Sequence, residues 1–354
     1  MVQEINIVRK KIRRGMARIA ILYPSTYEAA LSSLVFHMIY FLGNSFDEVF
    51  VERFVLTQGL IDRKLNELRS LDTGSPLRDF PLILASIHYE PDYVNLIRAL
   101  MGSGIDVLRH KRRHIVLVGG PAPMANPVPL EDIVDAVIVG EVENSLPEIL
   151  RTWLEYMNDP RGFLEALACK KGFYVPGYNS GAERTWVSSL DNTFYPTRQI
   201  QGIGKEPVYG RGFLLEVSRG CPLWCRFCME GRLFKPFRQR SIFKLTKLIS
   251  EGTEVNRVNR IIVYSLFFPT KNDHYLLEYL IKENYKASLP SMRIDLISES
   301  TLDLVSVLGQ RTITVAPENV SDYGEKVLCK CFRGRDFVKD TLSMIIRKNF
   351  DLKM

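Results

Sequence analysis

The sequence has no long apolar run, although hydrophobic residues make up 46% of its 354 positions. A membrane-spanning helix needs about 20 such residues in a row, so we expect no transmembrane segment and no membrane partner. Residues 1–25 place basic residues before a short apolar stretch, but that stretch ends in Tyr23-Pro24 and has no small-residue cleavage site. This argues against a signal peptide, and we expect a protein of the cytoplasm.

Cysteine and histidine are scarce, with six and five copies, which limits the metal sites that the chain can build. Three cysteines, Cys221, Cys225 and Cys228, lie at spacing C-x3-C-x2-C directly after an apolar run. No second C-x2-C unit or nearby histidine completes a four-ligand zinc site, and a disulfide cluster does not suit a reducing compartment. Three thiolates on a tight loop can hold three irons of a [4Fe–4S] cluster and leave the fourth iron open. Zinc, disulfides and buried apolar thiols are the alternative interpretations.

This motif, with Phe227 in its aromatic position, resembles that of the radical S-adenosylmethionine (SAM) superfamily. In that superfamily the motif follows the first strand of a partial (β/α) barrel, and the open iron binds the amino and carboxylate groups of SAM. An electron from the cluster then releases a 5′-deoxyadenosyl radical. The resemblance implies a [4Fe–4S] cluster and SAM as cofactors, and an electron donor such as ferredoxin or flavodoxin as a partner.

Residues 1–157 are predicted to form a Rossmann-like α/β domain, because short apolar runs alternate with segments of helical spacing. The runs predict strands at 18–23, 49–56, 80–87, 115–118 and 136–139. The intervening segments predict helices at 27–42, 60–71, 91–101 and 143–156. Ligands of a parallel sheet bind at the carboxyl ends of the strands. Five residues fall at these ends: Ser25, Ser86, Gly119, Gly120 and Glu141.

Four segments of this domain, 23–28, 86–96, 119–127 and 139–143, look like the amino-terminal domain of B12-binding-type radical SAM proteins. The resemblance implies that the five strand-end residues contact cobalamin. No Asp-x-His-x-x-Gly motif occurs, so no residue is placed to ligate cobalt from below. Cobalamin binding and a structural domain with an empty cleft are therefore two alternatives, and His88 is expected to be a packed or hydrogen-bonding residue.

Residues 158–212 are rich in Gly, Pro, Asn and Ser and are predicted to be a linker of loops and short strands. Residues 213–354 are predicted to form an incomplete (β/α)6 radical SAM barrel. Its predicted strands are 213–218, 260–265, 292–297 and 312–316, and its predicted helices are 241–255, 273–285, 299–308 and 336–349. Cys169 is expected to be a half-buried structural cysteine. Cys329 and Cys331 are expected to be inert thiols, because two ligands are too few for the alternative, an auxiliary cluster.

Strand ends of the barrel are where the family contacts SAM. The resemblance therefore implies contacts from Phe227, Ser265, Ser298 and Glu318, with a helix-capping role as the alternative for Glu318. The second strand ends in Ser-Leu-Phe-Phe-Pro and lacks the Gly-Gly-Glu of many members. The chain stops at residues 350–354, where the fifth of the usual six strands is expected to begin. We expect a truncated form or a partner that completes the barrel, and weak stability or activity of these residues alone.

The net charge of +7 is concentrated in two basic runs, residues 9–14 and 109–114. Such runs bind phosphate backbones or form solvated loops, and no aromatic platform is interleaved with these two. A nucleic acid is therefore an open partner.

These features together predict a radical SAM enzyme. With cobalamin the expected outcome is methyl transfer; without it, methylthiolation or rearrangement. The alternatives are a non-catalytic iron–sulfur protein and a nucleic-acid-binding protein with a structural cluster. The sequence does not specify the substrate.

Overall fold

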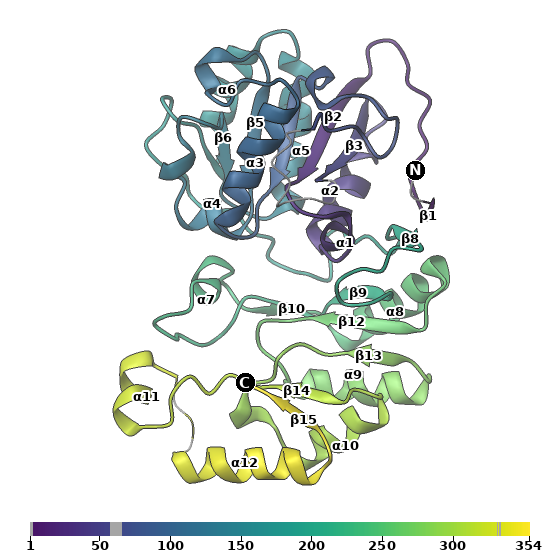
Figure 1. The fold of residues 1–354 in the computed structure, drawn as a ribbon, viewed down its shortest axis with the longest axis vertical. Coiled ribbons are helices and arrows are strands. Elements are labelled where there is room, and N and C mark those ends of the chain that lie inside the picture. The colour runs from purple at the N-terminus through teal and green to yellow at the C-terminus, as the bar shows by residue number, and fades with distance from the viewer. Residues whose placement is uncertain (1–2, 57–65, 331, 333) are drawn as a thin grey trace. The chain divides into compact units, whose positions relative to one another are not determined.

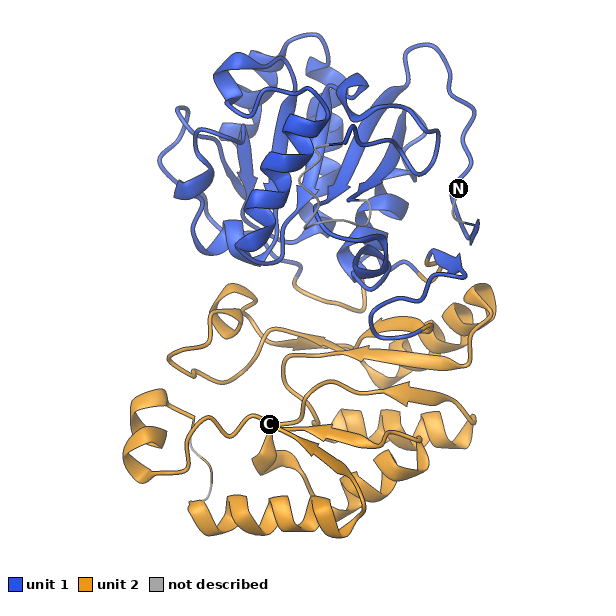
Figure 2. Cartoon of the chain, viewed as in Figure 1, with its two compact units in different colours: residues 1–187, 193–196, 200–210 blue, residues 188–192, 197–199, 211–354 orange. Residues whose placement is uncertain are grey.

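The computed structural model describes residues 3–56, 66–330, 332 and 334–354. The chain divides into two compact units (Figure 2). Unit 1 comprises residues 1–187, 193–196 and 200–210, and unit 2 comprises residues 188–192, 197–199 and 211–354. Within the described residues, no helix has both the length and the apolar character required to cross a membrane.

Unit 1 is built on a six-stranded sheet of order β3-β2-β4-β5-β6-β7 (Figure 1). The first five strands in this order are parallel, and β7 pairs antiparallel with β6 at the edge. The strands are β2 (Ala17–Tyr23), β3 (Val49–Val55), β4 (Leu82–Ser86), β5 (Ile115–Gly119), β6 (Ala136–Ile138) and β7 (Phe173–Tyr174). Nearly every strand residue is buried, as expected for a parallel sheet covered on both faces, so the predicted α/β architecture is confirmed.

Two apolar clusters fill the two faces of this sheet. Alternate residues of β2 divide between them, with Ile19 and Ile21 in one cluster and Ala20 and Leu22 in the other. The helices of unit 1 are α1 (Tyr27–Leu31), α2 (Leu34–Gly43), α3 (Pro91–Gly102), α4 (Pro121–Ala125), α5 (Val142–Tyr156) and α6 (Pro160–Ala168). Three short 3-10 turns are η1 (Leu77–Asp79), η2 (Arg109–Lys111) and η3 (Val128–Leu130).

Three predicted segments differ from the structure. The helix predicted over 27–42 is two helices, because Thr26 and Ser33 each stand at a helix N-cap. Of the helix predicted over 60–71, residues 60–65 lie outside the described residues, and residues 66–71 are not helical. The predicted linker contains α6, which starts where the Asp159 side chain accepts a hydrogen bond from the Gly162 backbone N–H.

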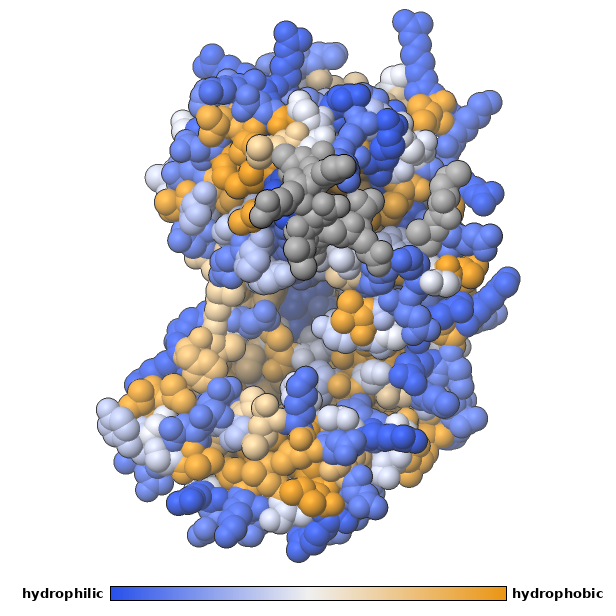
Figure 3. Space-filling view, in the orientation of Figure 1, coloured by the Kyte–Doolittle hydropathy of each residue, from blue (hydrophilic) through white to orange (hydrophobic). Residues whose placement is uncertain are grey.

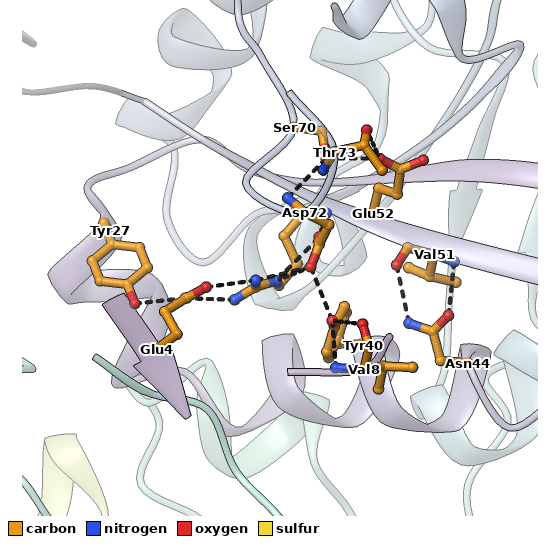
Figure 4. Close-up of polar contacts among 11 residues, drawn as sticks. Glu4, Val8, Tyr27, Tyr40, Asn44, Val51, Glu52, Ser70, Asp72 and Thr73 are labelled. Atoms are coloured by element: carbon orange, nitrogen blue, oxygen red, sulfur yellow. Dashed lines mark hydrogen bonds and ion pairs between the residues drawn. The ribbon is translucent and has the colours of Figure 1, made fainter. Parts of the chain in front are cut away.

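A buried ionic network ties the first strand to unit 1. Strand β1 (Gln3–Ile5) pairs antiparallel with β8 (Gln201–Ile203), and Glu4 on β1 accepts two hydrogen bonds from Arg53 at 2.7 and 2.8 Å. Arg53 is fully buried and also pairs with Asp72 at 2.9 Å. Figure 4 shows Tyr27 beside Glu4 and Tyr40 beside Asp72, with hydrogen bonds of 2.6 and 2.9 Å. Each buried charge is thus paired and hydrogen-bonded, which offsets its desolvation.

His37 of α2 lies next to this network and is buried in its neutral form. Its Nδ1 accepts a hydrogen bond from the Ile200 backbone N–H at 3.2 Å, so its Nε2 carries the proton and donates to the Leu31 carbonyl at 3.0 Å. Burial lowers the pKa of His37 to about 4.

We predict that His37 makes the stability of the protein depend on pH. The unfolded histidine takes up a proton near pH 6.5, whereas the folded one does so only near pH 4. Its stabilising contribution is therefore complete above about pH 6.5 and falls by about 3 kcal/mol as the pH drops to about 4. Chemical denaturation at several pH values should show that His37→Gln flattens this dependence while the exposed His110→Gln does not. An unchanged pH dependence in His37→Gln contradicts the assignment.

Unit 2 carries a three-stranded parallel sheet of order β13-β12-β9 and a separate parallel pair, β14 with β15. The strands are β9 (Phe213–Glu216), β12 (Arg260–Tyr264), β13 (Lys286–Ser288), β14 (Thr312–Thr314) and β15 (Asp351–Lys353). The helices are α7 (Glu230–Leu233), α8 (Ile242–Asn256), α9 (Lys271–Lys282), α10 (Glu299–Val307), α11 (Asp322–Leu328) and α12 (Arg335–Arg347). Figure 3 shows hydrophobic residues gathered on the viewed face of unit 2 near α12.

The strand predicted over 292–297 is wrong. The third strand of the sheet is β13, whose one buried residue, Ala287, gives little apolar signal. The apolar residues that suggested a strand lie around a 3-10 turn, η4 (Ile294–Leu296), and only Met292 forms a single parallel bridge, with Val315. The fifth strand, β15, does form and pairs with β14, as expected at the position where it was predicted to begin.

Candidate functional site

The cysteine motif lies on a loop that a short antiparallel ribbon closes at its base. Strand β10 (Ser218–Arg219), which follows β9, pairs with β11 (Arg238–Gln239). Gly220 then turns the chain at φ +83°, and a Cβ at this position would overlap the carbonyl oxygens of Phe234 and Pro236. Only glycine fits this close approach at a positive φ, so the entry to the loop is fixed by the sequence.

A largely buried carboxylate, Glu216, is bound by two arginines at the strand end that leads into this loop. Arg219 donates hydrogen bonds to both carboxylate oxygens of Glu216, at 2.8 and 3.0 Å, and Arg240 donates a third at 3.1 Å. Burial by itself raises the pKa of Glu216, but the guanidinium groups of Arg219 and Arg240 outweigh it and hold this pKa below its ordinary value. Arg240 is fully buried and also donates to the Glu216 and Leu190 carbonyls. We call these three residues the loop clamp.

The three cysteines of the motif are free thiols that interact with one another. Burial raises the pKa of Cys221, and the nearby Cys225 and Cys228 raise it further. The Cys225 carbonyl accepts from the Cys228 backbone N–H at 3.2 Å, and the Cys228 Sγ accepts from the Gly231 N–H at 3.4 Å. A Cβ on Gly231 would stand 3.7 Å from the Cys228 Sγ and 3.8 Å from the Cys221 Cβ. The loop thus brings these side chains around one small residue.

Over the part of the chain that the structure describes, no three His, Cys, Asp or Glu side chains are closed around a single metal position. The donor set nevertheless fits an iron–sulfur cluster. Three sulfur ligands on one loop suit iron. Cys225 and Cys228 raise the pKa of Cys221 because neighbouring thiolates repel one another. Bound metal cations relieve this repulsion and stabilise the thiolate form.

Cations and aromatic rings surround the loop. The Arg226 backbone N–H donates to the Leu328 carbonyl at 2.9 Å, so the loop docks on the end of α11. Phe227 is 50% exposed, and the Lys330 ammonium lies 5.6 Å from its ring centroid. Trp224 is 60% exposed and lies under both Lys235 and Arg232.

Of the two serines predicted to contact SAM, one lies at the cysteine loop and the other caps a helix. The Ser265 hydroxyl lies 2.7 Å from the Ser218 hydroxyl on β10, directly at the base of the cysteine loop. Ser298 is the N-cap of α10, and its hydroxyl accepts from the Thr301 N–H at 3.1 Å. The structure therefore uses Ser298 for capping.

Glu318 does not cap the helix that follows it, because Ser321 is the N-cap of α11. Its carboxylate pairs instead with Lys330 at 3.1 Å, and the same ammonium lies over Phe227. Lys330 thus links Glu318 to the cysteine loop. Lys330 was not among the predicted site residues, and neither was Arg293, whose positive charge acts against the raised pKa of Cys221. Neither residue belongs to a motif, so no sequence signal identified them.

In unit 1 some of the predicted strand-end residues lie at the ends of β4 and β5, and the others form hydrogen bonds within the unit. Ser86 and Gly119 pair across β4 and β5, and Gly120 has φ +119°, where a Cβ would overlap the Ile87 carbonyl. Glu141 is buried and is bound by Arg184 at 2.9 Å and by the Val187 N–H at 3.0 Å. Glu141 therefore fastens a neighbouring segment of unit 1. The Ser25 carbonyl accepts from the Leu56 N–H in the turn after β2.

A polar group stands at the carboxyl ends of β2 and β4. The His88 Nε2 lies 3.4 Å from the hydroxyls of both Ser33 and Ser86, and its ring lies 5.3 Å from that of Tyr23. Burial lowers the pKa of His88 and raises that of Asp92, which accepts from the His88 backbone N–H. Burial also raises the pKa of Tyr23 to about 12. His88 is hydrogen-bonded, as expected.

Comparison with known proteins gives three findings. Residues 35–176 match the family model described as Radical SAM proteins, N-terminal. A curated relative, an uncharacterized protein of Methanocaldococcus jannaschii, is 29% identical over 90% of this chain and 64% of its own length. The chain therefore spans less than two thirds of that relative.

Two solved structures of the radical S-adenosylmethionine methyltransferase TsrM from Kitasatospora setae share the fold. One, with tryptophan substrate and a SAM analog bound, has a TM-score of 0.63 and 14% identity over 95% of this chain and 66% of that chain. The other, with cobalamin and a [4Fe–4S] cluster bound, has a TM-score of 0.58 and 11% identity, over 95% and 68%. The family match confirms the resemblance to radical SAM proteins, and the solved structures show that the fold is shared.

We predict that neutralising the clamp carboxylate destabilises unit 2. Glu216→Gln removes the negative charge 3.1 Å from the buried Arg240 guanidinium, and breaking a buried ion pair costs about 3–5 kcal/mol. The exposed Glu251, 3.8 Å from Lys247, provides the matched control, and Glu251→Gln should change stability by less than about 1 kcal/mol. Urea denaturation measures both changes. Equal stability of the two variants contradicts a supporting role for the clamp.

Proposed function

We propose that this protein is a radical SAM enzyme. The observation that carries the proposal is the cysteine loop after a parallel strand, where Cys221 and Cys228 lie beside Gly231 and Cys225 is close enough to raise the pKa of Cys221. The family match over residues 35–176 supports it independently of the cysteines, because that match lies outside them. A [4Fe–4S] cluster on these thiolates would supply the electron that cleaves SAM.

The residues of unit 2 have separate tasks in this proposal. The loop clamp fixes the direction in which the chain leaves β9, and so fixes the cysteines. Ser265 can contact a ligand at the cysteine loop, because its hydroxyl is hydrogen-bonded to Ser218 at the base of that loop. Phe227 and Glu318 contact the same ligand from the side of Lys330, whereas Ser298 acts only by capping α10. We further propose that the parallel strands of unit 2 are part of an incomplete (β/α)6 barrel over residues 213–354.

For residues 1–157 we propose a cobalamin-binding role. The carboxyl ends of β4 and β5 place Ser86, Gly119 and Gly120 together, and a glycine pair lets the backbone approach a ligand closely. Ser25 and Glu141 shape the adjoining turns through their internal hydrogen bonds. One solved structure of similar fold has cobalamin and a [4Fe–4S] cluster bound, which supports the proposal. Methyl transfer to an unidentified substrate is the outcome that we infer.

Anaerobic reconstitution tests the cluster and the activity separately. We expect about four irons per chain in the wild type and fewer than one after Cys221→Ser, Cys225→Ser and Cys228→Ser together. The matched control is Cys169→Ser with Cys329→Ser, which should keep the iron of the wild type. With a reductant and SAM, the wild type should then release 5′-deoxyadenosine. A full cluster without this product indicates the non-catalytic iron–sulfur alternative, and full iron in the triple variant contradicts the site itself.

Hydroxocobalamin tests unit 1. After mixing and gel filtration, we expect the absorption bands of the corrinoid to elute with the protein. Gly120→Val places a side chain where even a Cβ overlaps the Ile87 carbonyl, so it should release the corrinoid. Because this change also strains the backbone, circular dichroism must show a folded chain, and Gly181→Val, at an open position, is the control. Corrinoid that separates from the wild type favours the structural-domain alternative.

A further inference from the structure

The two basic runs, residues 9–14 and 109–114, lie along the same edge of the unit 1 sheet. The first run comes shortly before β2, which starts at Ala17, and the second comes directly before β5, which starts at Ile115. Strand β4 lies between β2 and β5 and is parallel to both, so all three strands start at the same edge. Two strand spacings separate β2 from β5, which is about 10 Å. Segments about 100 positions apart in sequence therefore form one surface, which we call the basic edge.

One lysine anchors the first run and leaves its neighbours at the surface. The Lys10 ammonium donates to the Phe46 and Val49 carbonyls, both at 2.6 Å, at the start of β3. Burial lowers its pKa, while the nearby Asp47 and Glu48 act in the opposite direction. The flanking cations are exposed: Arg9, Lys11, Arg13 and Arg14. Nothing in the described ranges forms an ion pair with these four side chains.

One arginine anchors the second run in the same way. Arg112 pairs with Asp135 at 2.8 Å and donates to the Val107 and Ile133 carbonyls, at the start of β6. His114 donates from Nε2 to the Arg78 carbonyl at 2.8 Å, which fixes the run to the segment before β4. Lys111 and Arg113 are left exposed at the surface. The charges of the basic edge are thus held on backbone that is fastened at β3, β4 and β6.

We propose that the basic edge binds the phosphate backbone of a nucleic acid. The basic edge has six exposed cations, and three of them are arginines of the first run. A guanidinium group can bind a phosphate through two hydrogen bonds. Anchored loops lose little conformational entropy on binding. Ile12 is the one large apolar side chain exposed within the two runs, whereas membrane-surface binding takes a whole apolar face. No aromatic residue in the runs stacks on bases, so the recognition is independent of sequence.

This inference goes beyond the proposed function and does not depend on it. The carboxyl ends of the strands, where Ser86 and Gly119 lie, are at the opposite edge of the same sheet. A nucleic acid on the basic edge therefore leaves the proposed corrinoid site free. Binding can be measured with the full chain before any cluster is loaded, so failure here leaves the radical SAM proposal standing, and the reverse also holds.

The experiment follows the binding of a fluorescent RNA duplex of about 20 base pairs between about 50 and 200 mM salt. One phosphate contact for each of the six exposed cations predicts that log K falls against log salt with a slope of about −5.4. The test variant neutralises four cations of the basic edge: Arg13→Gln, Arg14→Gln, Lys111→Gln and Arg113→Gln. The control removes the same charge from ion pairs elsewhere in unit 1: Arg151→Gln, Arg161→Gln, Lys170→Gln and Lys171→Gln.

We expect the test variant, which keeps only Arg9 and Lys11, to bind at least about tenfold more weakly and with a slope of about −1.8, whereas the control keeps most of the slope. A DNA duplex distinguishes the source of the phosphates, and equal binding of both duplexes is the expected result. Equal losses in the two variants overturn the proposal, because the effect is then one of net charge alone. Binding to phosphatidylserine vesicles in the absence of duplex binding also overturns it.

Discussion

The proposed chemistry of this protein depends on one buried carboxylate. Glu216 ends the first parallel strand of unit 2, and the two guanidinium groups of Arg219 and Arg240 hold it in its charged form. Because Arg219 is followed directly by Gly220 and Cys221, the same contact sets the direction of the cysteine loop. A cluster ligand needs a fixed position, and a loop of small and aromatic residues does not provide one by itself.

In unit 1 a buried arginine with two carboxylate partners likewise holds separate segments together. Arg53 is fully buried in β3, and Glu4 from the first strand and Asp72 from a loop accept its hydrogen bonds. Both units thus use an arginine with paired carboxylate oxygens to join segments that are distant in sequence. Removal of one partner from such a group leaves an uncompensated charge, so the groups specify the arrangement as well as stabilising it.

The sequence predicted what depends on local patterns. The parallel strands of unit 1 and the cysteine motif follow from apolar runs and from spacing, and the structure contains both. The strand at 292–297 was wrong because a 3-10 turn can bury Met292 and Ile294 as well as a strand does. Contacts between distant residues could not be predicted, since no periodicity relates Lys330 to Phe227 or Glu4 to Arg53. The position of the two basic runs along one edge likewise required the strand order.

The central claim is that three thiolates of one loop hold a cluster with an open iron. Electron paramagnetic resonance of the anaerobically loaded and reduced protein, recorded with and without SAM, tests it most directly. The account predicts the signal of a reduced [4Fe–4S] cluster whose g values shift when SAM is added, because SAM binds at the open iron. A signal that SAM leaves unchanged, or a protein that takes up zinc and no iron, contradicts it.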